Sequence, residues 1–360
     1  MKHELVRGLQ ARAAALRYGN PARGVKVIAV AGPYGKTTVA MLLSELLQES
    51  GASVMTLTNQ GSFINGKPIN TGYDVSADRL QQQLQRAKKQ KIYYVILEVT
   101  EPLLATCALA TLPIEMAITT GDSPSAQALL SQSVTSTVIP AGFLHGDVTV
   151  APHQAISFGF EESAEAYIDR VTERRKGTEI DLVVDHQTRV SAATYLVGKA
   201  NALNVAAAVS AAYVLAVKID DFQEGIARLE GVVGNYEYIE TDDVYDIVVD
   251  RVPTLESLEL VLATVNRLKK RRVIVVADST IERETYQLIV KESDRAFAVT
   301  DGPDVPGIDK AASINAAVEL AKRAAKKDDV LLLLGTEVGA IQPGGLSMAH
   351  QLFATKGAHE

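Results

Sequence analysis

The residues with the clearest capacity for chemistry lie in the segment AGPYGKTT at positions 31–38. A buried-strand pattern precedes the segment and a helical pattern follows it. In that setting Gly32 and Gly35 let backbone N–H groups turn toward a phosphate chain, and the start of the helix adds its positive end. The ammonium of Lys36 reaches the β- and γ-phosphates, and the hydroxyl of Thr37, beside Thr38, can hold Mg²⁺. The pattern predicts a phosphate loop that binds ATP with Mg²⁺.

The loop has the short form G-x-x-G-K-T-T, because position 30, where the longer motif has glycine, holds valine. The alternative interpretation is a tight strand-to-helix turn whose lysine is solvated. The strand–loop–helix context favours the phosphate loop.

Alternating strand and helix patterns surround the loop and must position it. Short apolar runs predict strands over 25–31, 53–57, 93–98, 116–119 and 135–139. Helical spacing predicts helices over 36–50, 200–217 and 221–229, and the first residues, 1–17, read as an amphipathic helix. Asn65-Gly66 indicates a hairpin at 62–68, and residues 155–195 read as several successive strands. Strands that alternate with helices predict a doubly wound, mostly parallel α/β sheet.

The strand and helix pattern restarts after a glycine turn at 231–234. Strands are expected over 236–240, 245–250, 273–277, 296–300 and 330–334, and helices over 254–268, 281–292 and 313–326. We therefore expect an ATP-binding α/β domain over 1–232, whose residues 1–24 form a helix and linker. A smaller Rossmann-like α/β domain is expected over 233–360, with ATP between the two.

Composition excludes several classes of protein. The chain has 360 residues, a formal net charge of −7, 47% hydrophobic residues and one cysteine. The acidic balance argues against a nucleic-acid binder. A single cysteine rules out a disulfide framework and a Cys-based zinc site. No apolar run has the length of a membrane span, so we expect a cytoplasmic protein.

The segment VIAVAGPYGKTT at 27–38 resembles the ATP loop of the Mur ligases, which use ATP to join an amino acid to a peptidoglycan precursor. Further segments are similar, in the same order, to the tripeptide-synthetase branch of that family, which acts on a UDP-N-acetylmuramoyl peptide. They are TLTNQGSFINGKPINTG (56–72), YVILEVT (94–100), VGKANALNVAAAVSAA (197–212), LEGVVGNYEYIE (229–240), DRVPTLESLELVL (250–262) and DDVLLLLGTEVGAIQ (328–342). The resemblance also implies that the family's N-terminal domain is absent.

The resemblance implies roles for particular residues. Glu98 is similar to the family's magnesium ligand, and a carboxylate at the end of a parallel strand beside the loop suits a hard cation. Asn204 matches an adenine contact, Asn201 lies three residues before it, and Asp250 matches a further nucleotide contact. The alternatives are a solvent-facing glutamate, solvated asparagines and a strand-end cap. Lys36 and Glu98 would be the catalytic residues, and Thr37 and Glu98 the metal ligands.

Several family features are missing. The family has a second-metal histidine after the strand at 116–119, where this chain reads TTGDSPSAQ. The family's carbamylated lysine has no counterpart, because no lysine lies between 92 and 175. At the domain junction the family has arginine and this chain has Asn235, so a cation near the phosphates is lost. The family also has a histidine shortly after the aspartate that matches Asp250, whereas this chain continues with Arg251 and lacks that histidine. The losses fall on the second metal and the acceptor side.

Three functions remain open at this stage. The first is an ATP-dependent, ADP-forming acid–amino acid ligase that acts through an acyl phosphate, with impaired or diverged catalysis. Its substrates would be a UDP-muramoyl-peptide-like carboxylate and an amino acid. The second is a catalytically degenerate homologue that binds nucleotide, or only keeps the fold, as a regulatory or scaffold partner. The third is a phosphate-loop ATPase whose work is conformational.

Overall fold

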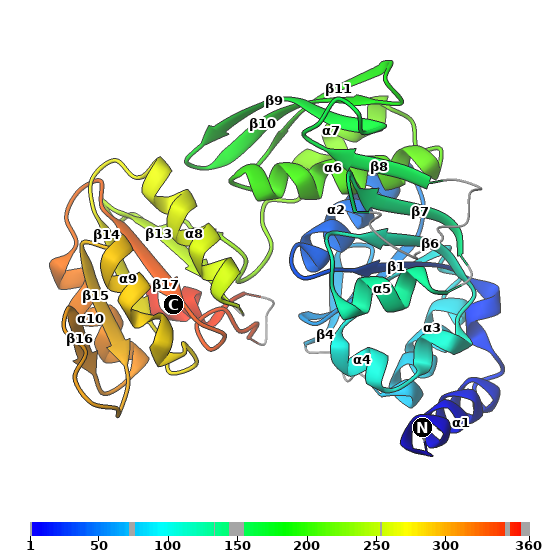
Figure 1. The fold of residues 1–360 in the computed structure, drawn as a ribbon, viewed down its shortest axis with the longest axis horizontal. Helices are drawn as coiled ribbons and strands as arrows, with labels where there is room; N and C mark the ends of the chain where they lie inside the picture. The colour runs from blue at the N-terminus through cyan, green and yellow to red at the C-terminus, as the bar shows by residue number, and fades with distance from the viewer. Residues whose placement is uncertain are drawn as a thin grey trace, which may run out of the picture. The chain divides into compact units, whose positions relative to one another are not determined.

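The computed structural model describes residues 2–71, 76–132, 134–143, 155–252, 254–342 and 346–353. The chain divides into two compact units (Figure 1). The first comprises residues 1–173 and 177–230, and the second comprises 174–176 and 231–360. Each unit is built around its own sheet.

In the first unit the described strands form a sheet of 11 strands in the order β11-β10-β9-β8-β7-β6-β1-β5-β2-β3-β4. Their bounds are β1 Lys26–Ala31, β2 Val54–Thr58, β3 Gly61–Ile64, β4 Lys67–Thr71, β5 Tyr94–Glu98, β6 Ile114–Thr119, β7 Val134–Pro140, β8 Ala155–Gly159, β9 Ala166–Arg174, β10 Gly177–Val184 and β11 Thr188–Thr194. The centre of the sheet is parallel, from β2 through β5, β1, β6 and β7 to β8. The β2–β3–β4 edge is antiparallel, as is the β10–β11 pair.

Helices cover both faces of this sheet. Their bounds are α1 Lys2–Arg17, α2 Lys36–Glu49, α3 Ala77–Lys89, α4 Glu101–Ala105, α5 Pro124–Leu130, α6 Lys199–Val214 and α7 Asp220–Ala227, with 3₁₀ turns at Pro21–Gly24 and Ala108–Thr111. Val27, Ala29 and Ala31 of β1 pack into one core with apolar side chains of α3, α4 and α5. Because side chains alternate along a strand, Ile28 and Val30 point to the opposite face, where α2 packs against α6 and α7.

The second unit is a smaller sheet of the same kind. Its described strands lie in the order β12-β13-β17-β14-β15-β16, and only the β12–β13 pair is antiparallel. The strands are β12 Glu237–Ile239, β13 Asp246–Asp250, β14 Val273–Ala277, β15 Arg295–Val299, β16 Ile308–Ala311 and β17 Val330–Leu334. The helices are α8 Leu255–Leu268, α9 Tyr286–Glu292, α10 Ile314–Ala324 and α11 Met348–Phe353, with a 3₁₀ turn at Arg283–Thr285. Side chains of α8 and α9 pack on one face, and those of α10 and α11 on the other.

The predicted fold class, a doubly wound and mostly parallel α/β sheet followed by a smaller α/β sheet, is confirmed. The hairpin at 62–68 forms as β3 and β4, with Asn65 and Gly66 at positive φ of 47° and 72°. The successive strands expected over 155–195 form as β8 to β11, which continue the main sheet. The helix expected over 281–292 begins only at Tyr286, after the 3₁₀ turn. The sequence pattern does not predict α3, α4, α5, α11 or β16.

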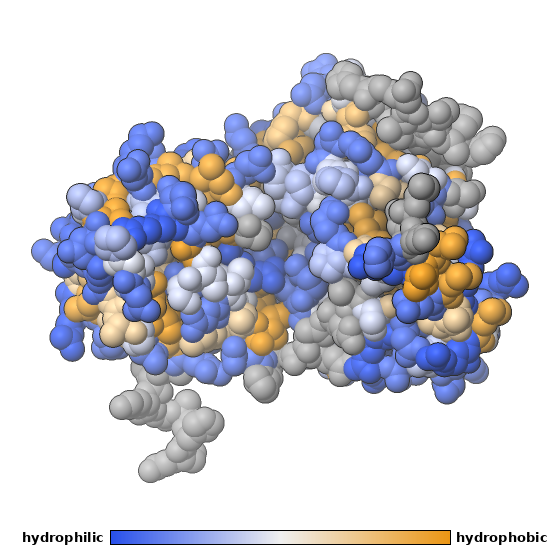
Figure 2. Space-filling view, turned by 60° about the horizontal axis from the view of Figure 1, so that its bottom comes forward, coloured by the Kyte–Doolittle hydropathy of each residue, from blue (hydrophilic) through white to orange (hydrophobic). Residues whose placement is uncertain are grey.

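The face of the molecule in Figure 2 is largely hydrophilic, with hydrophobic residues gathered in separate small patches. None of the helices in the described parts of the chain combines the length and the apolar character that crossing a bilayer requires.

Candidate nucleotide site

The loop between β1 and α2 lies at a topological switch point of the first sheet. Strand β1 leads into α2 on one face, whereas its neighbour β6 leads into α5 on the other face. The chain therefore diverges at the carboxyl ends of two adjacent parallel strands, which is where open α/β sheets bind ligands. Figure 1 shows α2 and α5 leaving this edge of the sheet.

Two glycines shape the loop into a cradle. Gly32 and Gly35 have positive φ values of 141° and 75°. A Cβ atom on Gly32 would lie 2.1 Å from the hydroxyl oxygen of Thr120, and one on Gly35 would lie 2.1 Å from Oδ1 of Asn204. Any other residue at either position would meet a collision as well as backbone strain. The loop can therefore bring its amides close to a bound group only with glycine at both places.

Lys36 begins α2 and folds back over the loop. Its Nζ donates a hydrogen bond to the carbonyl oxygen of Gly32 at 2.7 Å. Burial lowers the pKa of this ammonium, and the carboxylates of Glu98 and Glu101 oppose that shift. A phosphate chain would stabilise a partly buried ammonium beside a glycine cradle, because the negative charge of the phosphates offsets the cost of desolvating the ammonium.

Thr37 and Glu98, which the sequence predicts as metal ligands, lie side by side. The Thr37 hydroxyl donates to Oε2 of Glu98 at 2.9 Å, and the backbone N–H of Asn59 donates to the same oxygen at 3.1 Å. Glu98 is 1% exposed, so it is not a solvent-facing glutamate. A carboxylate and a hydroxyl are hard oxygen donors of the kind that Mg²⁺ accepts. Thr38 follows in the same helical turn and is buried.

Three residues near the loop were not singled out from the sequence. Asn59 follows β2, and its side-chain oxygen lies 3.4 Å from the Thr37 hydroxyl. At the end of β6 the Thr120 hydroxyl donates to the carbonyl oxygen of Tyr34 at 2.5 Å. Thr119 is fully buried beside β1, and its hydroxyl has no hydrogen-bond partner among the described residues. Their only sequence signal is that each lies at or just after the carboxyl end of a strand.

The two asparagines of α6 reach the loop from the side. The Asn201 side-chain amide donates to the carbonyl oxygen of Val197 at 2.8 Å, and that of Asn204 donates to Oδ1 of Asn201 at 3.0 Å. These two hydrogen bonds orient the Asn204 side chain so that its Oδ1 lies against Gly35. Both asparagines are partly buried, and α6 packs against α2. The structure therefore brings Asn204 to the start of the loop helix.

Asp250 lies in the second unit, at the carboxyl end of β13. Its carboxylate accepts the backbone N–H of Tyr236 at 2.9 Å and that of Val252 at 2.8 Å. These bonds make it a strand-end cap within its own unit, and a nucleotide contact stays a prediction. Burial raises the pKa of Asp250 to about 6, against the opposing effect of the two amides and of Arg251.

This shift predicts a pH-dependent stability. Between pH about 4 and about 6 the folded chain keeps a proton on Asp250 that the unfolded chain has lost, so stability falls as pH rises through this range. Asp250→Asn does not titrate. Urea titrations give the free energy of unfolding of the wild type and of Asp250→Asn at each pH. We expect the wild-type value minus the variant value to fall by about 1–3 kcal/mol from pH 4 to pH 7. A difference that does not change with pH would contradict the assignment.

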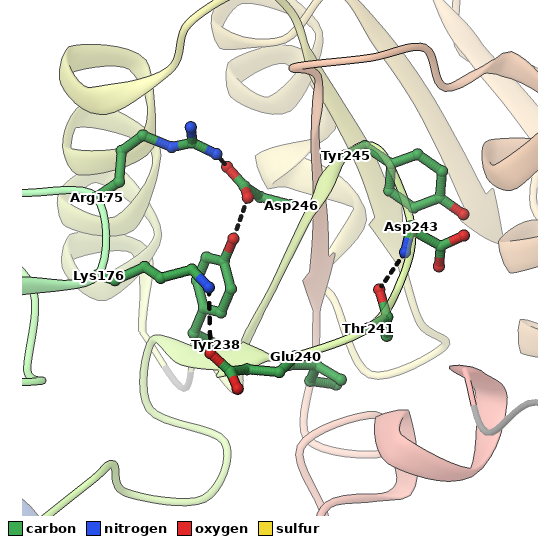
Figure 3. Close-up of a pocket in the computed structure, with 9 residues that line it drawn as sticks. Arg175, Lys176, Tyr238, Glu240, Thr241, Asp243, Tyr245 and Asp246 are labelled. Carbon is green, nitrogen blue, oxygen red and sulfur yellow. Dashed lines mark hydrogen bonds and ion pairs between the residues drawn. The ribbon is translucent and has the colours of Figure 1, made fainter.

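A pocket of about 420 Å³ lies in the second unit, away from Asp250 (Figure 3). It flanks the start of β13, whereas Asp250 ends that strand. Its polar side chains satisfy one another: Asp246 pairs with Arg175 and accepts the Tyr238 hydroxyl, while Lys176 pairs with Glu240 at 3.1 Å. The pocket therefore brings together none of the residues predicted for the nucleotide site.

The fold and the loop define a phosphate-loop α/β protein, and comparison with known proteins narrows that class. Residues 30–123 match the family model of the Mur ligase middle domain. The UDP-N-acetylmuramoyl-L-alanyl-D-glutamate–2,6-diaminopimelate ligase of Halalkalibacterium halodurans is 26% identical over 318 residues, which are 81% of this chain and 65% of that relative. The corresponding ligase 1 of Clostridium acetobutylicum is 26% identical over 358 residues, covering 88% of this chain and 74% of the relative. The chain thus spans less than two thirds of the Halalkalibacterium enzyme.

Two solved structures share the fold. A structure of a UDP-N-acetylmuramoyl-L-alanyl-D-glutamate–2,6-diaminopimelate ligase has a TM-score of 0.69 at 21% identity, over 94% of this chain and 78% of that one. Mycobacterium tuberculosis folylpolyglutamate synthase complexed with ADP has a TM-score of 0.77 at 14% identity, over 97% and 95% of the two chains. The match of residues 30–123 to the Mur ligase middle domain and the similarity to these ligases support the resemblance that the sequence predicted.

Proposed function

We propose that the chain binds Mg-ATP and acts as an ADP-forming ligase that joins a carboxylate to an amino acid. The observation that carries the proposal is the cradle of Gly32 and Gly35, with the partly buried Lys36 and the Thr37–Glu98 pair next to it in sequence and in space. The names of the related ligases support a UDP-muramoyl-peptide-like carboxylate as one substrate. ATP would come from the cytoplasm, where we expect the protein to act.

The residues present fit the nucleotide and the metal. A Cβ atom on Gly32 or Gly35 would occupy the space that the cradle leaves for a phosphate. The buried Thr119 hydroxyl has no hydrogen-bond partner among the described residues, and Thr37 and Glu98 supply hard oxygen donors. Mg²⁺, when bound, would neutralise charge on the transferring phosphoryl group. Thr37 and Glu98 would hold it there, while the loop amides and Lys36 hold and orient the β- and γ-phosphates.

The chemistry would then take two steps. A carboxylate oxygen of the first substrate attacks the γ-phosphorus of ATP, which forms an acyl phosphate and releases ADP. The amine nitrogen of the amino acid next attacks the acyl carbon, and inorganic phosphate leaves as the amide bond forms. Lys36 stabilises the charge in the first step by its position.

A degenerate homologue is the second candidate, because the chain lacks the family's second-metal histidine and carbamylated lysine. One missing charge in a water-excluded site costs roughly 10²–10³ in rate. Such a protein would bind ATP through the same loop and release little ADP. The loop itself is consistent with either candidate.

ADP release separates the two candidates. Ligase activity predicts ADP formation that requires both a UDP-muramoyl peptide and an amino acid, at a rate well below that of an intact Mur ligase assayed in parallel. A coupled assay with each substrate omitted in turn measures this dependence. ATP binding without substrate-dependent ADP release, across a panel of amino acids and carboxylates, would reject the ligase and favour the degenerate homologue.

A further inference from the structure

Two loops flank the phosphate loop at the carboxyl edge of the first sheet. Strand β1, which ends in the phosphate loop, lies between its parallel neighbours β5 and β6. The chain leaves β5 toward α4 and leaves β6 toward α5, and these two helices contact each other (Figure 1). A side chain that reaches from the loop after β5 to the loop after β6 therefore crosses the end of β1.

Glu101 makes this connection. It is the first residue of α4, three residues after Glu98. Its Oε1 accepts the backbone N–H of Ser125, in the first turn of α5, at 3.2 Å. The side chain is exposed, and its Oε2 has no hydrogen-bond partner among the described residues. The bond to Ser125 thus fixes the carboxylate and leaves one oxygen open to a ligand.

The phosphate loop meets the same loop after β6. A Cβ atom on Gly121 would lie 3.1 Å from the ring of Pro33, so the tip of the phosphate loop packs against this segment. The negative charge of Glu101 opposes the fall in the pKa of the Lys36 ammonium that burial causes, so these two groups lie within electrostatic range of each other. The open oxygen of Glu101 is therefore near the place where the γ-phosphate is expected.

The second step of the proposed reaction needs a proton acceptor at this place. The amine of an amino acid is an ammonium ion at neutral pH, so its nitrogen can attack only after a proton has left. A carboxylate beside the acyl phosphate attracts the ammonium by its charge and can take that proton. Glu98 does not fit this role, because it is 1% exposed and its Oε2 already accepts the Thr37 hydroxyl and the Asn59 N–H. Glu101 is the exposed carboxylate of the two.

We propose that Glu101 binds the ammonium group of the amino acid and takes its proton in the second step. The inference rests on the proposed function. One N–H bond of the ammonium breaks, and the proton passes to Oε2 of Glu101. The freed lone pair of the nitrogen forms the bond to the acyl carbon, and the bond from that carbon to the phosphate oxygen breaks. The departing phosphate keeps the electron pair and takes a second proton from the nitrogen, which leaves the neutral amide.

The test compares Glu101→Gln with the wild type and uses two nucleophiles. The variant keeps an oxygen that can accept the Ser125 N–H but loses the charge. Each full chain receives Mg-ATP, UDP-N-acetylmuramoyl-L-alanyl-D-glutamate and either 2,6-diaminopimelate or hydroxylamine. Hydroxylamine is uncharged at neutral pH and converts an acyl phosphate into a hydroxamate without a protein base. We expect Glu101→Gln to slow amide formation about 10²-fold or more and to leave hydroxamate formation within about twofold of the wild type.

Two further variants sharpen the comparison. Glu101→Asp keeps the charge on a shorter side chain, and its rate of amide formation should fall between those of Glu101→Gln and the wild type. Glu115→Gln is the matched control, because Glu115 is a carboxylate of the same unit whose partner, Lys26, begins β1 at the opposite edge of the sheet. It should match the wild type with both nucleophiles.

Each outcome bears on the proposal. Equal losses of hydroxamate and amide in Glu101→Gln would place the residue in the first step or in the fold alone, and would overturn the proposal. Wild-type rates with both nucleophiles in Glu101→Gln would reject this inference and leave the proposed function standing. A wild-type chain that forms neither product would reject both.

Discussion

Lys36→Ala should weaken Mg-ATP binding at least roughly 100-fold. In the proposed site the ammonium of Lys36 would contact the β- and γ-phosphates. Its Nζ lies 2.7 Å from the Gly32 carbonyl oxygen, at the loop. Burial already lowers its pKa, so the group gains from a phosphate partner more than a solvated lysine would. Calorimetric titration of Mg-ATP into wild type and variant measures the effect.

Lys26→Ala is the matched control. Lys26 begins the same strand, β1, at the opposite edge of the sheet, and pairs with Glu115 at 3.2 Å. Its removal should leave the affinity for Mg-ATP unchanged. Equal affinities in Lys36→Ala and Lys26→Ala would mean that the loop lysine does not contact the nucleotide, and the tight-turn interpretation would then hold.

Glu98→Gln should remove most of the Mg²⁺ dependence of ATP binding. The substitution keeps the size of the side chain but takes away the negative charge beside the Thr37 hydroxyl, and a neutral amide is a poor ligand for Mg²⁺. We expect ATP affinity with Mg²⁺ to fall toward the value without it. If ADP release is detectable in the wild type, its rate should fall by about 10²–10³.

Glu115→Gln provides the comparison for this variant. Glu115 lies near the start of β6, at the edge of the sheet away from the loop, and its partner is Lys26. Its loss should leave the Mg²⁺ dependence intact. A Glu98→Gln protein that responds to Mg²⁺ as the wild type does would exclude Glu98 as a metal ligand, and thermal unfolding checks that both variants fold.

The loop could be predicted because local sequence controls it, and Glu98 could be singled out because it ends an apolar strand and resembles the family's magnesium ligand. Two glycines followed by lysine and threonine form a phosphate loop when a strand precedes them and a helix follows them. Both the strand pattern and the helix pattern are clear in the sequence. Glu98 ends a strand of apolar residues, so its place at the edge of the sheet follows from strand polarity. The pairing of β5 with β1 then brings it to Thr37.

The contacts that depend on the order of strands could not be predicted. Thr119 and Thr120 meet the loop because β6 lies next to β1, a neighbour distant in sequence. Arg251 meets Asn235 because Gly234 and Gly339 leave room for its stem. From the sequence the arginine at 251 and the asparagine at 235 read as two separate departures from the family, whereas in the structure they form one contact.

Titration of the wild-type chain with Mg-ATP tests the central claim most directly. The glycine cradle, Lys36 and the Thr37–Glu98 pair predict saturable binding at one site per chain that weakens when Mg²⁺ is withheld and is lost in Lys36→Ala. A folded wild-type protein that takes up no Mg-ATP would contradict the account, and would show that the phosphate-loop fold has been retained for a purpose other than nucleotide binding.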